Sequence, residues 1–174
     1  MKIRPAKLND LDEIHQLFQF ITQWLQNQGN FQWNLDYPSK KVLKQDIKNN
    51  ALFVNVQNDE IVACITIDTF QPKNYAQIPW SISGKPICIH RLAVLPKFQG
   101  QNIGYKMCLF AEQLALEKGF DVIRLDSYAQ NHAAHHLYQK KLGYHLLKDH
   151  PINVNGTAFC QCFEKEICPE NDSF

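Results

Sequence analysis

The first indication of the fold is the sequence Leu92-Ala93-Val94-Leu95-Pro96-Lys97-Phe98-Gln99-Gly100-Gln101-Asn102-Ile103-Gly104. An apolar run with strand character, residues 87–95, ends at Pro96, and polar residues then lead into an amphipathic helix over 101–118. Such a junction directs unpaired backbone N–H groups and the positive end of a helix dipole at one point, so it predicts an anion site. Gly100 and Gly104 allow a ligand to approach the backbone, and Asn102 tolerates a left-handed conformation.

Two common phosphate-binding motifs are excluded at this junction. A P-loop needs Lys-Ser or Lys-Thr after its last glycine, but Tyr105-Lys106 follows Gly104. The dinucleotide pattern Gly-x-Gly-x-x-Gly is also missing. The junction instead resembles the pyrophosphate loop of the GCN5-related N-acetyltransferases (GNAT), which is Gln/Arg-x-x-Gly-x-Gly/Ala after a Val-x-Pro strand end. Here the pattern reads Gln99-x-x-Asn102-x-Gly104, with Asn102 where the family usually has glycine.

A second segment, residues 131–144, makes the resemblance more specific. It looks like the family signature Asn-x-x-Ala-x-x-x-Tyr-x-x-x-Gly-Phe/Tyr, and it follows another apolar strand at the usual place. Two motifs in the right order are a much stronger indication than either alone. The resemblance extends over most of the chain, roughly residues 1–167.

The order of expected elements is one strand, two helices and then β-β-β-α-β-α-β-β. The resemblance implies the GNAT fold, a mixed and mostly antiparallel α/β sheet with helices on both faces. In that fold two central parallel strands splay apart and take the pantetheine arm of the cofactor. Residues 1–168 are expected to form a single domain, with 169–174 as a flexible tail.

Local patterns predict the remaining boundaries. Asn9 and Ser39 are suited to cap the two early helices. We expect strands at 51–56 and 61–69, an irregular loop at 71–86, a helix at 131–141, and a closing pair at 144–147 and 157–166 around a connection at 151–156.

Composition excludes several classes of protein. The chain has 174 residues, 45% of them hydrophobic, and a net charge of +1, so nothing favours a nucleic-acid partner. The N-terminus lacks an apolar signal region and no run approaches the ~20 apolar residues of a membrane span, so we expect a cytoplasmic protein with no membrane partner. In that compartment we expect the six cysteines to be reduced thiols.

The resemblance implies acetyl-CoA as acetyl donor and no metal. His132, His135 and His136 are spaced so that their side chains could bind a metal from one face of a helix, but the family uses no metal. Lys97 and Lys106 could meet phosphate charge or be ordinary surface lysines. Cofactor binding is expected from the backbone of the central strand, from the glycine-containing loop and from the second motif: Leu92, Ala93, Val94, Gln99, Gly100, Gln101, Asn102, Ile103, Gly104, Tyr105, Asn131 and Tyr138.

Catalytic roles also follow from the resemblance. Tyr138 would protonate the leaving thiolate, since a phenol with a pKa near ~10 is protonated at neutral pH. Asn131 lies seven residues earlier, almost two α-helical turns, so both side chains would point the same way. The base that deprotonates the amine is Asp126, His90 or water.

The acceptor is expected to be a small amine, an amino acid or a peptide N-terminus. The aromatic loop at 31–38 could hold a cation through Trp33, Asp36 and Tyr37, with Trp80 from the later loop, or its aromatics could simply cover the core. Dimers are common in the family, so a homodimer is compatible with the resemblance.

The sequence therefore predicts an N-acetyltransferase in which an amine attacks acetyl-CoA directly within a ternary complex. The alternative is a non-catalytic acyl-CoA-binding regulator of the same fold, against which the intact Tyr138 counts. A nucleotide-dependent kinase is disfavoured because the P-loop residues are missing.

Overall fold

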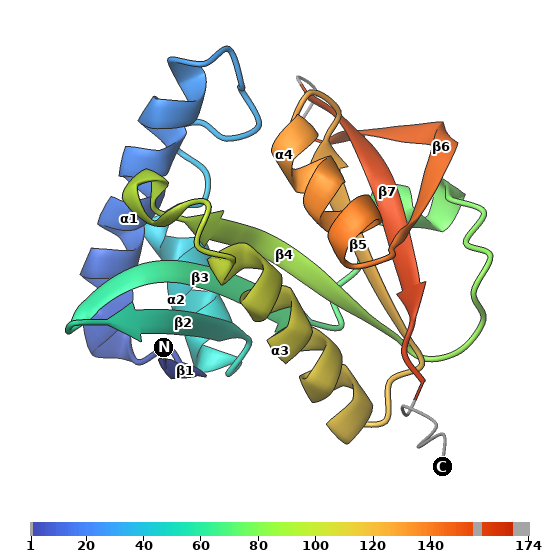
Figure 1. Ribbon diagram of the computed structural model, residues 1–174, viewed down its shortest axis with the longest axis horizontal. Coiled ribbons are helices and arrows are strands. Elements are labelled where there is room, and N and C mark those ends of the chain that lie inside the picture. Colours follow the sequence, from blue (N-terminus) through green and yellow to red (C-terminus); the bar gives the residue numbers. More distant parts are fainter. Residues whose placement is uncertain (1, 155–157, 169–174) are drawn as a thin grey trace. The chain divides into compact units, whose positions relative to one another are not determined.

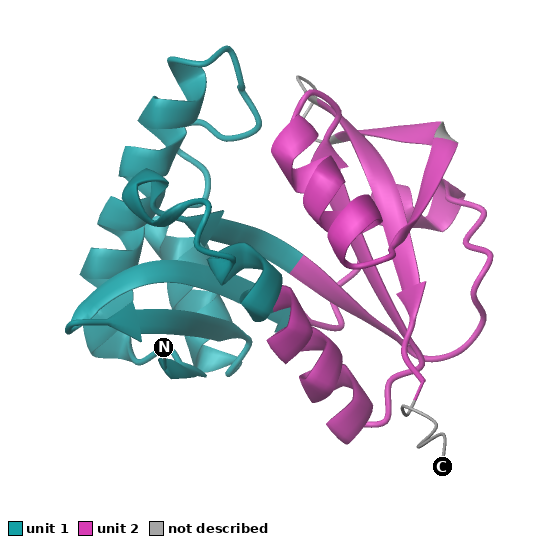
Figure 2. Ribbon diagram, viewed as in Figure 1, with its two compact units in different colours: residues 1–67, 90–107 teal, residues 68–89, 108–174 magenta. Residues whose placement is uncertain are grey.

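The computed structural model describes residues 2–154 and 158–168, and it divides into two compact units. Unit 1 comprises residues up to 67 together with 90–107, and unit 2 comprises 68–89 and the described residues from 108 onward. Figure 2 shows that one strand and one helix each run through both units. They are β4 (Pro86–Val94) and α3 (Ile103–Glu117). The predicted tail at 169–174 lies outside the described residues.

Unit 1 is built from two helices packed on a small sheet. Its elements are β1 (Lys2–Pro5), η1 (Leu8–Asp10), α1 (Leu11–Gln26), α2 (Lys40–Lys48), β2 (Leu52–Gln57), β3 (Glu60–Asp68), the second half of β4, and η3 (Pro96–Phe98). Strands β1, β2 and β3 are antiparallel neighbours, with Lys2 opposite Val56 and Leu52 opposite Thr66. Both helices lie on one side of these strands (Figure 1).

The core of unit 1 follows from periodicity. Helix α1 buries Ile14, Leu17, Phe18 and Ile21, which recur at helical spacing. They pack against alternate residues of β2, Leu52 and Val54, and against Leu43 and Ile47 of α2. The expected cap Ser39 is confirmed, since its hydroxyl accepts the Val42 N–H at 3.3 Å.

The expected cap at Asn9 is wrong. Asn9 lies inside η1, and α1 begins only at Leu11. The carboxylate of Asp10 accepts the backbone N–H of Lys7 at 2.6 Å and pairs with Arg4 at 2.7 Å. Asp10, and not Asn9, therefore anchors the start of α1.

Unit 2 contains the parallel pair of the sheet. Its elements are η2 (Lys73–Gln77), the first half of β4, β5 (Val122–Tyr128), α4 (His132–His135), η4 (His136–Lys141), β6 (His145–Val154) and β7 (Ala158–Glu166). The strands follow the order β4-β5-β7-β6. Strand β4 pairs in parallel with β5 from Pro86 to Cys88, and β7 pairs antiparallel with β5 and β6. The mixed α/β class is thus confirmed.

Two boundaries in unit 2 differ from the sequence prediction. The loop at 71–86 contains the short helix η2, in which Tyr75 is buried. The connection expected to begin at Pro151 is strand instead, because β6 continues to Val154 after a register shift between Leu147 and Ile152. The remainder of that connection, residues 155–157, lies outside the described residues.

The helix predicted at 131–141 is only partly an α-helix. It consists of the α-helical turn α4 followed by a π-helix, η4. The family signature has three residues between its tyrosine and its glycine, whereas four separate Tyr138 from Gly143 here. A π-helical turn accommodates one more residue than an α-helical turn, so the π-helix absorbs this extra residue.

Among the residues that the structure describes, no helix is both long and apolar enough to cross a bilayer. In the same part of the chain, no three His, Cys, Asp or Glu side chains come together as a metal site would require.

Candidate active site

The loop between β4 and α3 in unit 1 has the geometry of an anion site. Gly100 and Asn102 both adopt left-handed conformations, with φ of +77° and +59°. The Asn102 carbonyl accepts the Lys106 N–H at 3.0 Å, so the helix starts there, and its first N–H groups point out of the helix end without partners in the helix. The first turn of α3 carries no acidic side chain. A Cβ placed on Gly100 would meet nothing within 4 Å, so the loop is open to a ligand.

Lys97 is engaged elsewhere. Its ammonium lies 2.7 Å from Glu60 Oε1 and 5.1 Å from the centre of the Phe98 ring. Its charge is therefore already partly balanced by a carboxylate, and a phosphate would have to compete with Glu60. The loop backbone is the stronger candidate for holding an anion.

The strand segment that precedes the loop is irregular. Arg91 of β4 has φ +51°, which is uncommon for a residue with a side chain. Ala93 is buried, whereas Leu92 and Val94 are half-buried. His90, one of the candidate bases, precedes this irregularity and is half-buried.

Tyr138 lies in the core of unit 2. Its side chain is 6% exposed and packs against Phe163 and Tyr144, with ring centroids 5.5 and 5.9 Å apart. Burial, and secondarily the Cys108 thiol and the Asp126 carboxylate, raises the pKa of the phenol well above its usual value. Burial therefore favours the protonated form of Tyr138.

Asn131 is placed differently from the prediction. It is the N-cap of α4, and its side-chain oxygen accepts the Ala134 N–H at 3.1 Å. The premise that Asn131 and Tyr138 lie two α-helical turns apart is wrong, because Tyr138 belongs to the π-helix. Asn131 thus has a definite capping role, and any contact with a cofactor would be additional to it.

Asp126 lies within β5, two residues before the strand ends at Tyr128, and is half-buried. The hydroxyl of Tyr75 donates a hydrogen bond to its Oδ1 at 2.7 Å. Burial, followed by the charge of Asp126 and its hydrogen bond, raises the pKa of the Cys160 thiol. The Asp126 carboxylate therefore bonds to Tyr75 and lies close to the Cys160 thiol. Its negative charge also acts on the Tyr138 phenol. We call Tyr75, Asp126, Tyr138 and Cys160 the Asp126 cluster.

Tyr75 is the residue of this cluster that sequence reasoning missed. Burial, with the Asp126 carboxylate next in importance, raises the pKa of Tyr75 well above its usual value. It stands 51 positions from Asp126 in the sequence, in a segment without regular period. The only signal was the presence of aromatic residues in that loop, which does not indicate a partner.

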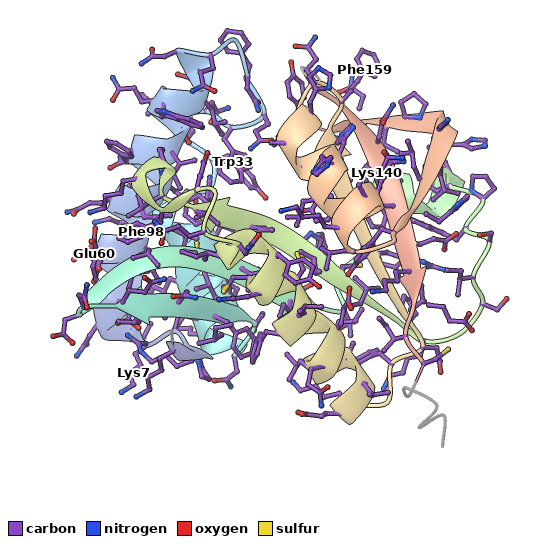
Figure 3. The ribbon with its side chains drawn as sticks, viewed as in Figure 1. Lys7, Trp33, Glu60, Phe98, Lys140 and Phe159 are labelled. Carbon is purple, nitrogen blue, oxygen red and sulfur yellow. The ribbon has the colours of Figure 1, made fainter. Side chains whose placement is uncertain are left out.

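The aromatic acceptor candidates are mostly engaged in packing. In unit 1, Trp33 packs edge-on against Phe18 of α1 at 5.1 Å (Figure 3), and Tyr37 Oη accepts a hydrogen bond from Arg91 at 2.9 Å. Asp36 is exposed, and its backbone N–H bonds to the Asn34 side chain. Core covering is therefore an observed role of Trp33, while the carboxylate of Asp36 faces solvent.

Trp80 belongs to unit 2 and contacts Tyr75, the hydrogen-bond partner of Asp126. Its ring lies 5.1 Å from that of Tyr75, and its indole N–H donates to the Tyr75 carbonyl at 3.1 Å. The Arg124 guanidinium lies 4.6 Å from the Trp80 ring centre. Trp80 thus holds the segment that carries Tyr75.

A mixed sheet with a central parallel pair, a left-handed loop at a helix N-terminus and the Asn131–Tyr138 segment define an acyltransferase of the GNAT type. The model of the acetyltransferase (GNAT) family matches residues 15–144, so the chain belongs to this family and is an acetyltransferase.

Individual relatives agree with this assignment. The chain is 27% identical over 170 residues to the uncharacterized N-acetyltransferase YesJ of Bacillus subtilis, covering 95% of this chain and 90% of that protein. A GNAT acetyltransferase from Streptococcus agalactiae has a TM-score of 0.80 at 21% identity, covering 97% of this chain and 96% of the other. The PaiA N-acetyltransferase of Thermoplasma acidophilum, solved with coenzyme A, has a TM-score of 0.69 at 19% identity, covering 95% and 98%. These solved structures show the fold.

Proposed function

We propose that this chain transfers the acetyl group of acetyl-CoA to a primary amine by direct attack in a ternary complex. The observation that carries the proposal is Tyr138, a phenol that is 6% exposed and whose pKa is raised by burial, which favours its protonated form. A side chain in that state is suited to donate a proton to a leaving thiolate.

The residues of unit 1 would hold the donor substrate. The open left-handed loop fits a pyrophosphate, because its backbone N–H groups and the dipole of α3 favour negative charge at one point. The backbone of β4 fits an extended amide-containing arm. The residues of unit 1 proposed for binding are Leu92, Ala93, Val94, Gln99, Gly100, Gln101, Asn102, Ile103, Gly104 and Tyr105. Asn131 and Tyr138 are the candidates of unit 2.

The base is Asp126, His90 or water. Asp126 is supported by its surroundings, since Tyr75 fixes the orientation of the carboxylate through Oδ1. A short aspartate held in this way would take the amine proton through an intervening water. His90 is supported by its position two residues before Leu92 and by the suitability of a neutral imidazole as a base near pH 7.

The acceptor proposed is a small amine, an amino acid or a peptide N-terminus. The exposed carboxylate of Asp36 supports a positively charged acceptor, which must lose a proton before it attacks. In unit 1 the rings of Trp33 and Tyr37 are proposed to contribute to acceptor binding, and Trp80 is the aromatic candidate of unit 2.

The test replaces Tyr138 with phenylalanine and measures amine-dependent thiol release from acetyl-CoA. We expect kcat to fall by about 10²- to 10⁴-fold, as for the loss of a general acid, while the Kd for acetyl-CoA measured by titration calorimetry stays within about threefold. Tyr144→Phe is the matched control, because Tyr144 is likewise buried and its ring packs against that of Tyr138.

Two outcomes would contradict the proposal. An unchanged kcat in the Tyr138→Phe protein would remove Tyr138 as the acid. Tight acetyl-CoA binding without thiol release for any amine in a broad panel would favour the non-catalytic acyl-CoA-binding regulator.

A further inference from the structure

Arg91 is the residue of β4 whose backbone departs most from a strand. Its φ of +51° lies in the left-handed region, which side chains rarely adopt and which glycine adopts freely. Such a conformation persists only where surrounding contacts impose it. The contacts that could impose it here involve the Arg91 side chain.

The guanidinium of Arg91 is held from two sides within unit 1. Nη2 lies 2.7 Å from Asp46 Oδ2 of α2, and Nη1 donates to Tyr37 Oη at 2.9 Å. The side chains of Arg91 and Asp46 are only 11% and 10% exposed. Thr66 of β3 donates its hydroxyl hydrogen bond to Asp46 at 3.2 Å, so the carboxylate is itself fixed. We call Tyr37, Asp46, Thr66 and Arg91 the arginine clamp.

The arginine clamp fixes one end of a short backbone segment. At the other end, the Leu95 N–H bonds to the Val62 carbonyl of β3 at 2.9 Å, which restores the sheet ladder. Residues 92–94 therefore run between a side-chain anchor and a ladder hydrogen bond. Their backbone groups are the ones proposed above to hold the arm of acetyl-CoA.

We propose that Arg91 is a positioning residue for acetyl-CoA, which sets the direction of the Leu92 and Val94 backbone groups through its bonds to Asp46 and Tyr37. This inference rests on the proposed function. A buried ion pair adds little net stability to a fold, so keeping one at a strained strand position needs another reason. Tyr37 then serves the cofactor strand, and its hydroxyl is not the group that recognises the amine.

The experiment measures the acetyl-CoA Kd by titration calorimetry, and the acceptor KM and kcat at saturating acetyl-CoA, on full-length variants. Arg91→Gly keeps a residue suited to φ +51° but removes the anchor, and we expect its Kd to rise about tenfold. Arg91→Lys should recover part of the lost acetyl-CoA affinity, because lysine keeps the positive charge but cannot bond to Asp46 and Tyr37 from two sides. Tyr37→Phe deletes one oxygen, and we expect Kd to rise about threefold with acceptor KM unchanged.

Arg4→Ala is the matched control. Arg4 also pairs with an aspartate at 2.7 Å in unit 1, but it lies in β1 and away from residues 92–94 in the sequence. The control should lose stability without a change in Kd.

The failures can be told apart. If the unsubstituted protein binds acetyl-CoA and both folded variants, Arg91→Gly and Tyr37→Phe, keep its Kd within twofold, the role of Arg91 is overturned. A raised acceptor KM with unchanged Kd in Tyr37→Phe overturns it as well. If Arg91→Gly does not fold, Tyr37→Phe alone decides. No binding of acetyl-CoA by the unsubstituted protein would instead overturn the proposed function.

Discussion

Asn102 adopts a backbone conformation that glycine usually supplies at this place in the family motif. Its φ of +59° is left-handed, and asparagine is among the few side chains that reach this region at small cost. We therefore expect Asn102→Gly to keep the acetyl-CoA Kd within about twofold. Asn102→Val should raise it about tenfold, because a β-branched residue at positive φ costs roughly 1–2 kcal/mol. Titration calorimetry distinguishes these outcomes, and a tenfold loss in Asn102→Gly would mean that the amide itself contributes to binding.

Asn55 is a polar side chain placed where an apolar one would fit. It is 0% exposed in β2, and both its amide oxygen and nitrogen lack hydrogen bonds to the residues that the structure describes. A buried amide without partners costs about 1–3 kcal/mol. We expect Asn55→Val to raise the free energy of unfolding by about 1 kcal/mol, as measured by urea denaturation. Asn55→Asp is the control and should be strongly destabilising, and a loss of stability in Asn55→Val would indicate a buried water bound to the amide.

The candidate site was predictable only where a local pattern specifies it. The left-handed loop follows from Gly100 and Asn102, and Tyr138 follows from its motif, because both depend on neighbours in the sequence. The bond of Tyr75 to Asp126 joins residues 51 positions apart, and Arg91 is held by side chains from a helix and a loop. Such contacts are set by tertiary packing, which single-sequence periodicity does not encode.

The π-helix η4 shows how an element absorbs a change in length. One extra residue between Tyr138 and Gly143 widens the turn while the segment before Tyr138 keeps its spacing. We expect deletion of the exposed Lys140 (Figure 3) to convert η4 to an α-helix and to shift the unfolding temperature by only a few degrees. Deletion of Glu112 from the middle of α3 is the control, because it shifts an entire buried face and should unfold the chain. Thermal unfolding followed by circular dichroism measures both, and equal losses would contradict this account.

Element types were predictable where a local pattern is strong. Helix α1 has an apolar stripe, and β2 and β3 are mostly apolar runs on either side of the turn at Asn58 and Asp59, which both adopt positive φ. Prediction was wrong where tertiary contacts override local signals. Strand β6 continues through Pro151 because, as the last strand in the order β4-β5-β7-β6, it does not need every N–H for the sheet.

Across the whole molecule, burial keeps many weak acids protonated. Five of the six cysteines are buried. Burial raises the pKa of their thiols, to about 12 for Cys88 and Cys162 and further for Cys64, Cys108 and Cys160. It also raises the pKa of Tyr75, Tyr138 and Tyr144 well above the usual value. Burial therefore favours the neutral form of each of these groups.

This preference for the neutral form predicts that the protein is sensitive to alkali. Above the unfolded thiol pKa of about 8.5 the unfolded chain binds fewer protons than the folded one, so the free energy of unfolding falls as pH rises, by up to about 1.4 kcal/mol per pH unit for each group. The five thiols lower the free energy of unfolding together, and the three phenols add to this loss above about pH 10. Within a few pH units the summed loss exceeds the roughly 5–15 kcal/mol by which a typical domain is stable. We expect unfolding between about pH 9 and 11 in the presence of a phosphine reductant, measured by urea midpoints at rising pH. The slope of the free energy of unfolding against pH should correspond to about one proton fewer in Cys88→Ala. It should be unchanged in Cys168→Ala, because that thiol is exposed. A midpoint that stays constant from pH 7 to 10.5 would show that the buried thiols ionise without opening the fold.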